Sequence, residues 1–189
     1  MCAHGSPENT PTQSRLNNIS YLFQSQRLGF RRWTADDLEA IYELYSHADV
    51  IPFIGDGDPI TREDTHLWLE VTNANFEKRG YGMIAMFELA TDQMVGCIGI
   101  VHPGQQPEAE VKYALFKTFW GMGFATETVQ AIVQHARSEW SVQDVIATVH
   151  PDNLGSMSVL TKAGFTREPD RIEEDGTPTV IFKNKKSAS

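Results

Sequence analysis

The sequence has few cysteines, few basic residues and no long apolar run. Its two cysteines, Cys2 and Cys97, do not make a disulfide framework, so we expect a reducing, cytoplasmic environment. No stretch approaches the roughly 18 consecutive apolar residues that a membrane span needs. The polar N-terminus also lacks the apolar core of a secretory signal. These absences predict a protein without a membrane partner.

Basic residues are outnumbered, with 16 Lys and Arg against 25 Asp and Glu and a formal net charge of −9. Nucleic-acid binding relies on basic side chains that face phosphates, so we expect no nucleic-acid partner. An acidic surface instead favours cationic molecules such as amines. The six histidines form no cluster with ligand spacing, and no H-E-x-x-H motif is present. We therefore expect no metal site.

Composition divides the chain near residue 20. Residues 1–20 are rich in Ser, Asn, Thr, Gln and Pro, and we expect them to form a disordered or loosely attached arm. Residues 21–189 suffice for a single domain with a hydrophobic core. Cys97 lies within the apolar run 94–101, so we expect a buried strand residue there rather than a nucleophile.

Hydrophobic periodicity predicts a helical first half followed by a mixed α/β sheet. In the second helix, Leu67, Val71 and Ala74 recur at helical spacing, so we expect them on its inner face with Trp68 beside them. The expected elements are a strand at 28–32, helices that start at Thr34 and Thr61, a hairpin of 82–89 and 95–101, a strand at 110–116, a helix after residue 123, a strand at 144–149, a helix at 153–163 and short strands near 165–167 and 179–182.

The most informative segment is 119–127, Phe-Trp-Gly-Met-Gly-Phe-Ala-Thr-Glu, between a strand and an amphipathic helix. Gly121 and Gly123 permit unusual backbone angles and close approach of an anion to the main chain. Successive N–H groups at the start of a helix form a site for a diphosphate. Because a simple tight turn would use the same glycines, this segment alone leaves both interpretations open.

A second segment, 153–165, begins with Asn153 and ends with Gly164 and Phe165; helix capping alone accounts for the Asn and the Gly. In this order, however, the two segments resemble the GNAT acyltransferase superfamily. Residues 111–127 resemble its acyl-CoA-binding motif, (Gln/Arg)-x-x-Gly-x-(Gly/Ala), and 153–165 resemble its neighbouring motif. The patterns Trp-Gly-x-Gly-Phe-Ala-Thr-Glu and Asn-x-x-Ser-x-x-Val-Leu-x-Lys-x-Gly-Phe, with the opening Leu-Gly-Phe-Arg-Arg-Trp-Thr-Ala-Asp-Asp-Leu, resemble the Rim-type ribosomal-protein N-terminal acetyltransferase branch.

The resemblance implies one N-acetyltransferase domain over 21–189. Its α/β fold would have a mixed, mostly antiparallel central sheet, splayed at the CoA-binding strands and flanked by helices. Acetyl-CoA would be the co-substrate, with pantetheine on the main chain of Leu115 and Phe116. The family's Gln/Arg position is Thr118 here, which removes one side-chain contact. The implied diphosphate-binding amides are those of Trp120, Gly121, Met122, Gly123, Phe124, Ala125 and Thr126.

The resemblance also implies a catalytic base. Glu110 matches the acidic residue of the family's Glu-Ile-Gly-Tyr-like strand, but Lys112 replaces the glycine. Both side chains lie on one face of the strand, so an ion pair would make Glu110 a poorer base. A purely structural ion pair is the alternative. Glu127 is expected to interact with the helix dipole rather than to act in catalysis.

The tyrosine that many relatives use to protonate the thiolate is replaced by Leu160. Ser156, which matches the Asn-x-x-Ser pattern, is then implied to hydrogen-bond the sulfur, and Asn153 is implied to fix the pantetheine or the substrate. A serine on the helix surface is the alternative for Ser156. The segments that form the substrate side in this superfamily contribute Trp33, Phe53, Trp68 and His102, although core packing or a surface loop explains such residues equally.

The expected activity is acetyl transfer to a primary amine, most simply the N-terminal α-amino group of a ribosomal or other protein. A small amine, such as a polyamine, amino acid or antibiotic, is the alternative acceptor. Two other classes stay open: an acyl-CoA-binding module without turnover, and a nucleotide-binding protein that uses the glycine turn. We expect a monomer or a homodimer.

Overall fold

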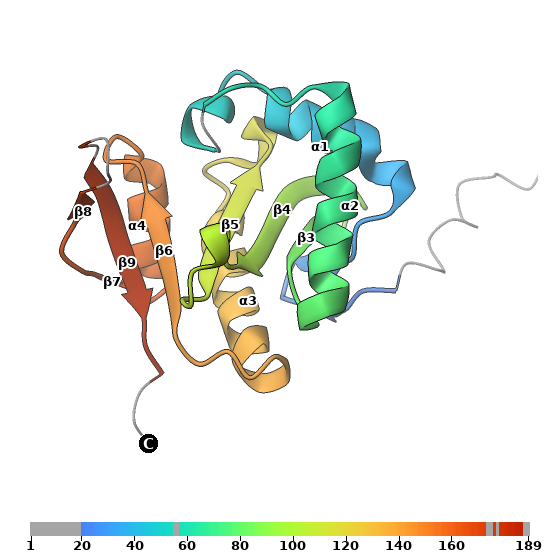
Figure 1. Ribbon diagram of the computed structural model, residues 1–189. Coiled ribbons are helices and arrows are strands. Elements are labelled where there is room, and N and C mark those ends of the chain that lie inside the picture. The colour runs from blue at the N-terminus through green and yellow to red at the C-terminus, as the bar shows by residue number, and fades with distance from the viewer. Residues whose placement is uncertain (1–19, 55–56, 173–175, 177, 187–189) are drawn as a thin grey trace, which may run out of the picture.

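The computed structural model describes residues 20–54, 57–172, 176 and 178–186, which form nine strands and four α-helices (Figure 1). The arm expected at 1–20 falls almost entirely outside the described residues, as does Cys2. The strands are β1 (Phe23–Gln24), β2 (Leu28–Arg31), β3 (Met83–Glu88), β4 (Met94–Val101), β5 (Glu110–Leu115), β6 (Val145–Val149), β7 (Thr166–Arg167), β8 (Arg171–Ile172) and β9 (Pro178–Asn184). The helices are α1 (Leu38–Ser46), α2 (Arg62–Arg79), α3 (Phe124–Glu139) and α4 (Leu154–Lys162).

The strands form one sheet in the order β1-β2-β3-β4-β5-β6-β9-β7, and β8 pairs with β9. Neighbouring strands are antiparallel except β5 and β6, which are parallel. These two strands run in the same direction and spread apart along their length (Figure 1). The expected mixed, mostly antiparallel sheet with a splayed pair is therefore confirmed.

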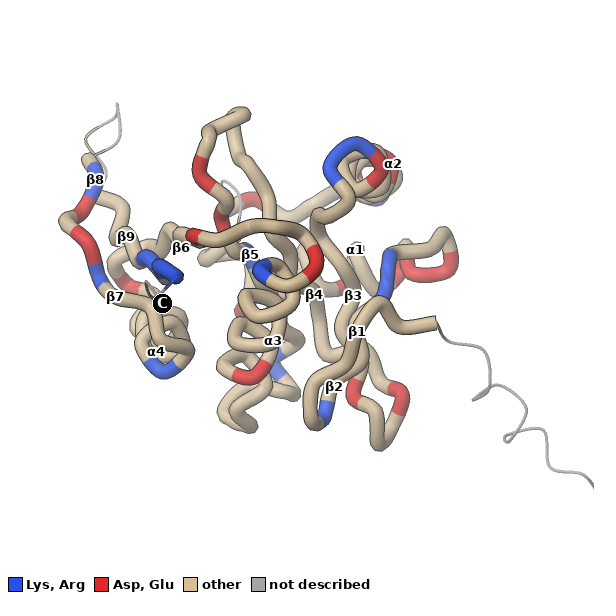
Figure 2. The backbone as a smooth tube through the Cα atoms, turned by 90° about the horizontal axis from the view of Figure 1, so that it is seen from below, with Lys and Arg blue, Asp and Glu red and all other residues tan. Residues whose placement is uncertain are grey.

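Helices cover both faces of the sheet (Figure 2). The face under α3 and α4 carries Ile84 and Ile98, which pack with α3 residues such as Ile132. The opposite face carries Ala85 and Cys97, which pack beneath α1 and α2. Successive strand residues point to opposite faces, so β3 and β4 contribute to two cores. Each fully buried aliphatic side chain stabilises the fold by about 1.5–3 kcal/mol.

Helix α2 buries a different face from the one predicted. Leu67 and Val71 are 58% and 50% exposed, and Ala74 is also exposed. The buried positions are instead Thr65 and Thr72, together with Leu69. The Thr65 hydroxyl donates to the Thr61 carbonyl at 2.8 Å, which satisfies its polar group inside the protein. Threonine can therefore pack its methyl group inward, and hydrophobicity alone selected the wrong face.

Several expectations for the second half are confirmed. The hairpin forms from β3 and β4, and α3 buries Val129, Ile132, Val133 and Ala136. Cys97 is fully buried, and burial raises the pKa of its thiol to about 11. It is a core residue, as predicted. None of the described helices combines the length and apolar character that crossing a membrane requires.

The entry to α1 is held by an ion pair between the partly buried Arg31 and the buried Asp37. Arg31 Nη1 and Nη2 each lie 2.7 Å from one carboxylate oxygen of Asp37. Thr34 donates its backbone N–H and its hydroxyl to the same carboxylate at 2.8 and 2.9 Å, so the predicted start of this helical segment is confirmed. Burial alone would raise the pKa of Asp37, but Arg31 and Thr34 outweigh burial and lower it.

Candidate active site

The boundary between β5 and β6, here called the seam, has almost no backbone pairing. The two strands are paired only at Glu110 and Ile146, and the Ile146 N–H donates to the Ala109 carbonyl at 2.9 Å. A parallel ladder normally continues along both strands. Beyond this pair the strands diverge, so an extended group of suitable length can lie between them.

Side chains bridge the seam next to the backbone pair. Glu110 is 2% exposed and accepts hydrogen bonds from the Thr148 hydroxyl, from the Thr148 N–H at 3.2 Å and from Gln106 Nε2 at 3.0 Å. Lys112 Nζ lies 2.6 Å from the same carboxylate and 2.7 Å from Thr148 Oγ1. The ion pair considered for Glu110 and Lys112 is therefore present within β5. The hydrogen bonds of both side chains with Thr148 tie β5 to β6.

A third bridge crosses the seam further along β5. The Tyr113 hydroxyl lies 2.7 Å from Ser156 Oγ on α4. Burial raises the pKa of Tyr113 to about 12, against the opposing effect of its hydrogen bond with Ser156. The Asn153 side chain caps α4 by accepting the Ser156 N–H at 2.9 Å. Ser156 is thus oriented through its backbone and its hydroxyl, while Leu160 is fully buried.

Tyr113 is a further residue of the site that was not expected from the sequence. It matches the tyrosine of the Glu-Ile-Gly-Tyr-like strand, and it lies on the face opposite to Glu110 and Lys112. Its partner lies 43 positions away, so the contact depends on how α4 packs beside β5. Tyr113 thus places a phenol next to Ser156 from strand β5. The position on α4 at which many relatives have a tyrosine holds Leu160.

Residues 121–126, here called the amide turn, lie between β5 and the body of α3. Gly121 and Gly123 have φ angles of 75° and 80°, the left-handed region that glycine favours. The N–H groups on either side are paired: Trp120 donates to Lys117 O at 3.0 Å and Glu127 to Gly123 O at 3.1 Å. Across the described part of the chain, the N–H groups of the amide turn have no hydrogen-bond partner.

Six unpaired N–H groups at the N-terminus of a 16-residue helix fit an anion that accepts several hydrogen bonds. Side chains leave room for such an anion, because a Cβ at Gly121 would meet no atom within 4 Å. The Trp120 indole folds back and donates to Leu115 O at 2.9 Å. Phe116 follows β5 directly and donates its N–H to Val95 O at 3.0 Å. Thr118 is exposed.

Two of the four predicted substrate residues meet on the α1–α2 face of the sheet. Trp33 and Trp68 make an edge-to-face contact with ring centroids 5.4 Å apart, and Tyr45 lies 5.2 Å from Trp68. Trp33 is 4% exposed, and its indole N–H is buried without a partner among the described residues. Phe53 is 44% exposed in the short 3₁₀ turn Ile51–Phe53.

His102 belongs to a different cluster. Its Nε2 lies 3.0 Å from the Tyr81 hydroxyl and its Nδ1 lies 3.0 Å from the Gln106 carbonyl oxygen. Gln106 in turn donates its side-chain amide to Glu110. His102 therefore holds the loop that precedes β5, and through Gln106 it is linked to the Glu110 network rather than to Trp33.

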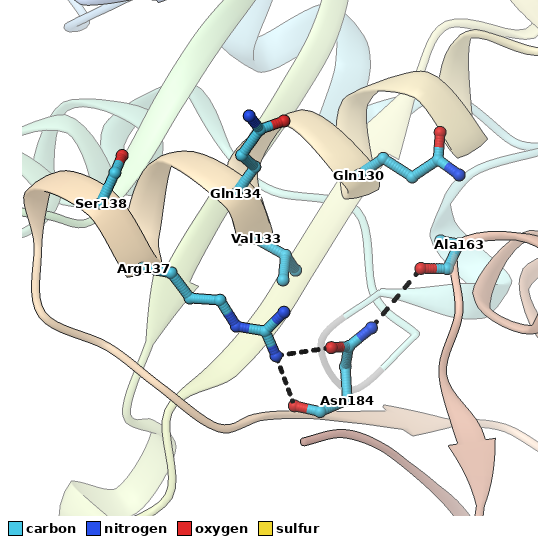
Figure 3. Close-up of a pocket in the computed structure, with 7 residues that line it drawn as sticks. All are labelled: Gln130, Val133, Gln134, Arg137, Ser138, Ala163 and Asn184. Atoms are coloured by element: carbon cyan, nitrogen blue, oxygen red, sulfur yellow. Dashed lines mark hydrogen bonds between the residues drawn. The ribbon is translucent and has the colours of Figure 1, made fainter. Parts of the chain in front are cut away.

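A cavity of about 400 Å³ on the outer side of α3 is separate from the seam (Figure 3). Its polar groups bind one another: Arg137 donates to Asn184 Oδ1 at 2.6 Å, and Asn184 Nδ2 donates to the Gly164 carbonyl at 3.1 Å. Arg137 also lies about 20 Å further along the helix than Gly123, at 1.5 Å per residue. The hydrogen bonds in this cavity join α3 to β9, and the cavity is remote from the amide turn.

A mixed sheet that opens at its parallel pair, with unpaired amides beside the opening, provides an extended slot next to an anion-binding helix start. The chain belongs to the family of the acetyltransferase (GNAT) domain, whose model matches residues 27–166. It is an N-acetyltransferase, and the family uses acetyl-CoA.

One relative in sequence and two solved structures of the same fold illustrate the similarity. The uncharacterized N-acetyltransferase YoaA of Bacillus subtilis is 28% identical over 162 residues, which cover 83% of this chain and 91% of YoaA. The structure of RimL, a ribosomal L7/L12 α-N-protein acetyltransferase in complex with coenzyme A, has a TM-score of 0.74 at 18% identity and covers 88% of this chain and 98% of its own. Spermidine N-acetyltransferase from Vibrio cholerae, in complex with CoA and spermine, has a TM-score of 0.71 at 15% identity and covers 85% and 96%.

Proposed function

We propose that this enzyme acetylates the N-terminal α-amino group of a protein or peptide, and that it belongs to the Rim-type branch of its family. The observation that supports this acceptor is the state of Glu110. Its carboxylate is buried and already binds Gln106, Thr148 and Lys112. A base held in this way has limited capacity to remove a proton, so an acceptor that is readily neutral suits the site best.

The difference between amine classes is large. A protein α-amino group has a pKa of about 7.7–8.0, so roughly a tenth or more is neutral at pH 7. A lysine-like amine with a pKa of about 10.4 needs roughly 4–5 kcal/mol for the same step. With an α-amine, Glu110 acts through an intervening water and only has to accept the proton that the amine loses on attack.

The other residues at the seam and the amide turn bind the cofactor, the departing sulfur and the acceptor. The amides of 121–126 hold the CoA diphosphate. The pantetheine arm lies along Leu115 and Phe116, where it competes with the Trp120 indole for the Leu115 carbonyl. Acetyl-CoA supplies the thioester, whose C–S bond breaks as the C–N bond forms. Ser156 donates a hydrogen bond to the departing sulfur, and Asn153 keeps the first turn of α4 in position. Phe53 and Trp68 line the route of the acceptor, and the buried Trp33 supports Trp68. His102 holds Gln106, which binds Glu110.

A polyamine is the second candidate acceptor. The formal net charge of −9 favours a small molecule with several positive charges. A structural neighbour is a spermidine acetyltransferase, which supports the same possibility through the fold alone. This acceptor demands more of Glu110, because its amines are protonated at neutral pH.

The test is release of free thiol from acetyl-CoA, with mass detection of the acetylated product. The panel contains peptides that begin with Ser or Ala, the same peptides with a blocked N-terminus and an internal Lys, and spermidine. We expect turnover only with free N-termini. Turnover with the blocked peptides would show that the acceptor is a lysine side chain. Turnover with spermidine alone would show that it is a polyamine. An enzyme that binds no CoA would overturn the proposed cofactor site.

A further inference from the structure

An acidic side chain lies where the proposed cofactor site must hold an anion. Glu127 is in the first turn of α3, one residue after the amide turn. A carboxylate there interacts favourably with the helix dipole, but it also repels a diphosphate bound to the same N–H groups. The structure contains a specific arrangement that offsets this repulsion.

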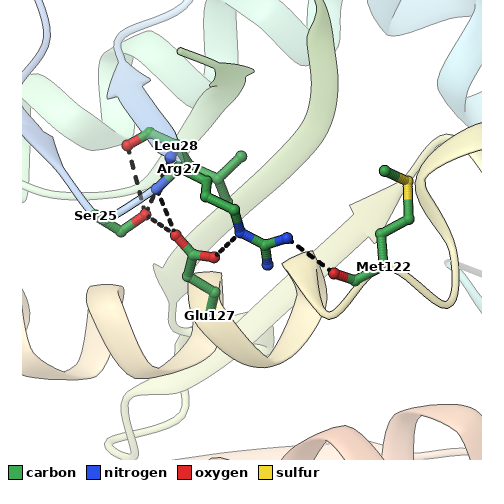
Figure 4. Close-up of polar contacts among 5 residues, drawn as sticks. All are labelled: Ser25, Arg27, Leu28, Met122 and Glu127. Atoms are coloured by element: carbon green, nitrogen blue, oxygen red, sulfur yellow. Dashed lines mark hydrogen bonds and ion pairs between the residues drawn. The ribbon is translucent and has the colours of Figure 1, made fainter. Parts of the chain in front are cut away.

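Arg27, from the turn between β1 and β2, binds Glu127 with its backbone and its side chain (Figure 4). Its N–H lies 2.8 Å from Oε1, and its Nε lies 2.7 Å from Oε2. Ser25 donates its hydroxyl to Oε1 at 2.7 Å. Burial raises the pKa of Glu127, but these hydrogen bonds outweigh burial and lower it. The carboxylate is therefore ionised and paired at neutral pH.

The same guanidinium contacts the amide turn directly. Arg27 Nη1 donates to the Met122 carbonyl at 3.0 Å, and the guanidinium carbon of Arg27 lies 4.2 Å from the centre of the Phe124 ring. In a trans peptide the C=O and the following N–H point in opposite directions. By holding the Met122 carbonyl, Arg27 turns the Gly123 N–H away from itself and toward the side where an anion can bind.

We propose that Arg27 is the positioning residue of the CoA diphosphate site. It neutralises Glu127 and fixes the direction of the Met122–Gly123 peptide, and it thereby sets the affinity for the diphosphate. The Gln/Arg position of the family motif holds Thr118 in this chain. The guanidinium at this site comes instead from Arg27, which lies 100 positions before Glu127. This inference rests on the proposed cofactor site.

The first experiment measures CoA affinity by calorimetry and acetyl transfer by thiol release for Arg27→Gln and the wild type. We expect CoA to bind at least about tenfold more weakly, and KM for acetyl-CoA to rise by a similar factor. The kcat at saturating acetyl-CoA should stay within about threefold, because Arg27 does not touch the reacting atoms. Equal CoA affinities in the two proteins would overturn the inference.

A matched control separates positioning from general stability. Arg31 also pairs with a carboxylate and also stacks on a ring, with its central carbon 4.3 Å from the Phe87 ring centre, but it lies away from the amide turn. Arg31→Gln should lower the melting temperature and leave the CoA dissociation constant unchanged. An equal loss of CoA affinity in both variants would mean that Arg27 acts through stability alone.

Two further comparisons identify the group on which Arg27 acts. With S-acetylpantetheine as donor, which lacks the diphosphate, Arg27→Gln and the wild type should have the same kcat/KM. With dephospho-CoA, which retains the diphosphate, the loss of affinity should persist. A loss with S-acetylpantetheine as well would assign Arg27 to the pantetheine arm or to the fold and overturn the inference.

The double variant Arg27→Gln/Glu127→Gln tests the charge directly. Removing the unpaired carboxylate should recover part of the CoA affinity lost in Arg27→Gln, and no recovery would contradict the neutralising role. If Arg27→Gln does not fold, Arg27→Lys is used instead; it keeps the charge but cannot bind Glu127 and Met122 together, so an intermediate affinity is expected. A wild type that binds no CoA refutes the proposed cofactor site, whereas unequal stability with equal binding refutes only the role of Arg27.

Discussion

The hydroxyl of Tyr113 lies 2.7 Å from Ser156 Oγ and joins β5 to α4 across the seam. Because the pKa of Tyr113 is raised to about 12, the phenol stays protonated throughout the neutral range. It can therefore hold Ser156 in one direction without a change of charge. The serine proposed to bind the departing sulfur is thus supported by a second hydroxyl from the neighbouring strand.

Ser156→Ala should lower kcat by about 100-fold, the lower end of the range for loss of a proton donor, and should leave KM for acetyl-CoA nearly unchanged. Tyr113→Phe should lower kcat by a smaller factor, because its hydroxyl acts through Ser156. The double variant should be no slower than Ser156→Ala. Steady-state thiol release measures all three. Multiplicative effects in the double variant would show that the two hydroxyls act independently.

Lys112→Met should raise kcat/KM several-fold if Glu110 is the base, since it removes the cation that lies 2.6 Å from the carboxylate. Glu110→Gln should lower kcat/KM by at least about tenfold. Thr148→Val serves as the control for the seam, because it removes a hydroxyl that binds Glu110 while leaving both charges. If Lys112→Met and Glu110→Gln instead cause similar losses of activity and stability, the pair is structural.

The ion pair of Arg31 and Asp37 predicts a pH-dependent stability. Asp37→Asn should cost about 3 kcal/mol at pH 7, as expected for a buried pair that loses one charge. The pKa of Asp37 is lower in the folded state than its ordinary 3.8, so this stabilisation is complete above about pH 5 and is lost as the pH falls through the folded value. Urea unfolding at pH 7, 5 and 3 should show the gap between the two proteins closing only toward the lowest pH.

Cys97 should react slowly with thiol reagents. The rise of its pKa from 9.0 to about 11 leaves about 100-fold less thiolate at pH 8, and burial blocks access in addition. In a Cys2→Ala background, where one thiol remains, the reaction with Ellman's reagent should be at least that much slower in buffer than in concentrated urea. A fast reaction in buffer would show that the core around Tyr45 and Cys97 opens readily.

Strong periodic patterns determined which parts of the fold could be predicted. The β3–β4 hairpin was evident as two apolar runs on either side of a turn-prone segment, and the buried stripe of α3 was evident as a nearly unbroken pattern of period 3.6. Helix α2 misled the prediction because two threonines, not its most apolar stripe, face the protein. The strands β1 and β8 have two residues each, which is too short to produce a pattern.

In the candidate site, too, some residues could be predicted from local sequence and others depend on tertiary packing. The glycines of the amide turn are local signals, and their positive φ angles were expected. Tyr113 and Arg27 meet their partners across 43 and 100 positions, so their roles depend on tertiary packing rather than on spacing. The pairing of Glu110 with Lys112 was foreseen because the two residues are two positions apart on one strand and share a face. The contacts of Thr148 and Gln106 with Glu110 became evident only in the structure.

The single backbone pair between β5 and β6 leaves the sheet with an interrupted ladder in its interior. The last strands are joined to the rest by Glu110, by Tyr113 and by the packing of α4 on α3. An extended cofactor arm with its own amide groups would act as an additional strand and restore continuity. In the free protein, the amides of β5 and of β6 should then exchange with solvent as two separate units. In the complex they should be protected together, so that the substrate completes the fold it binds.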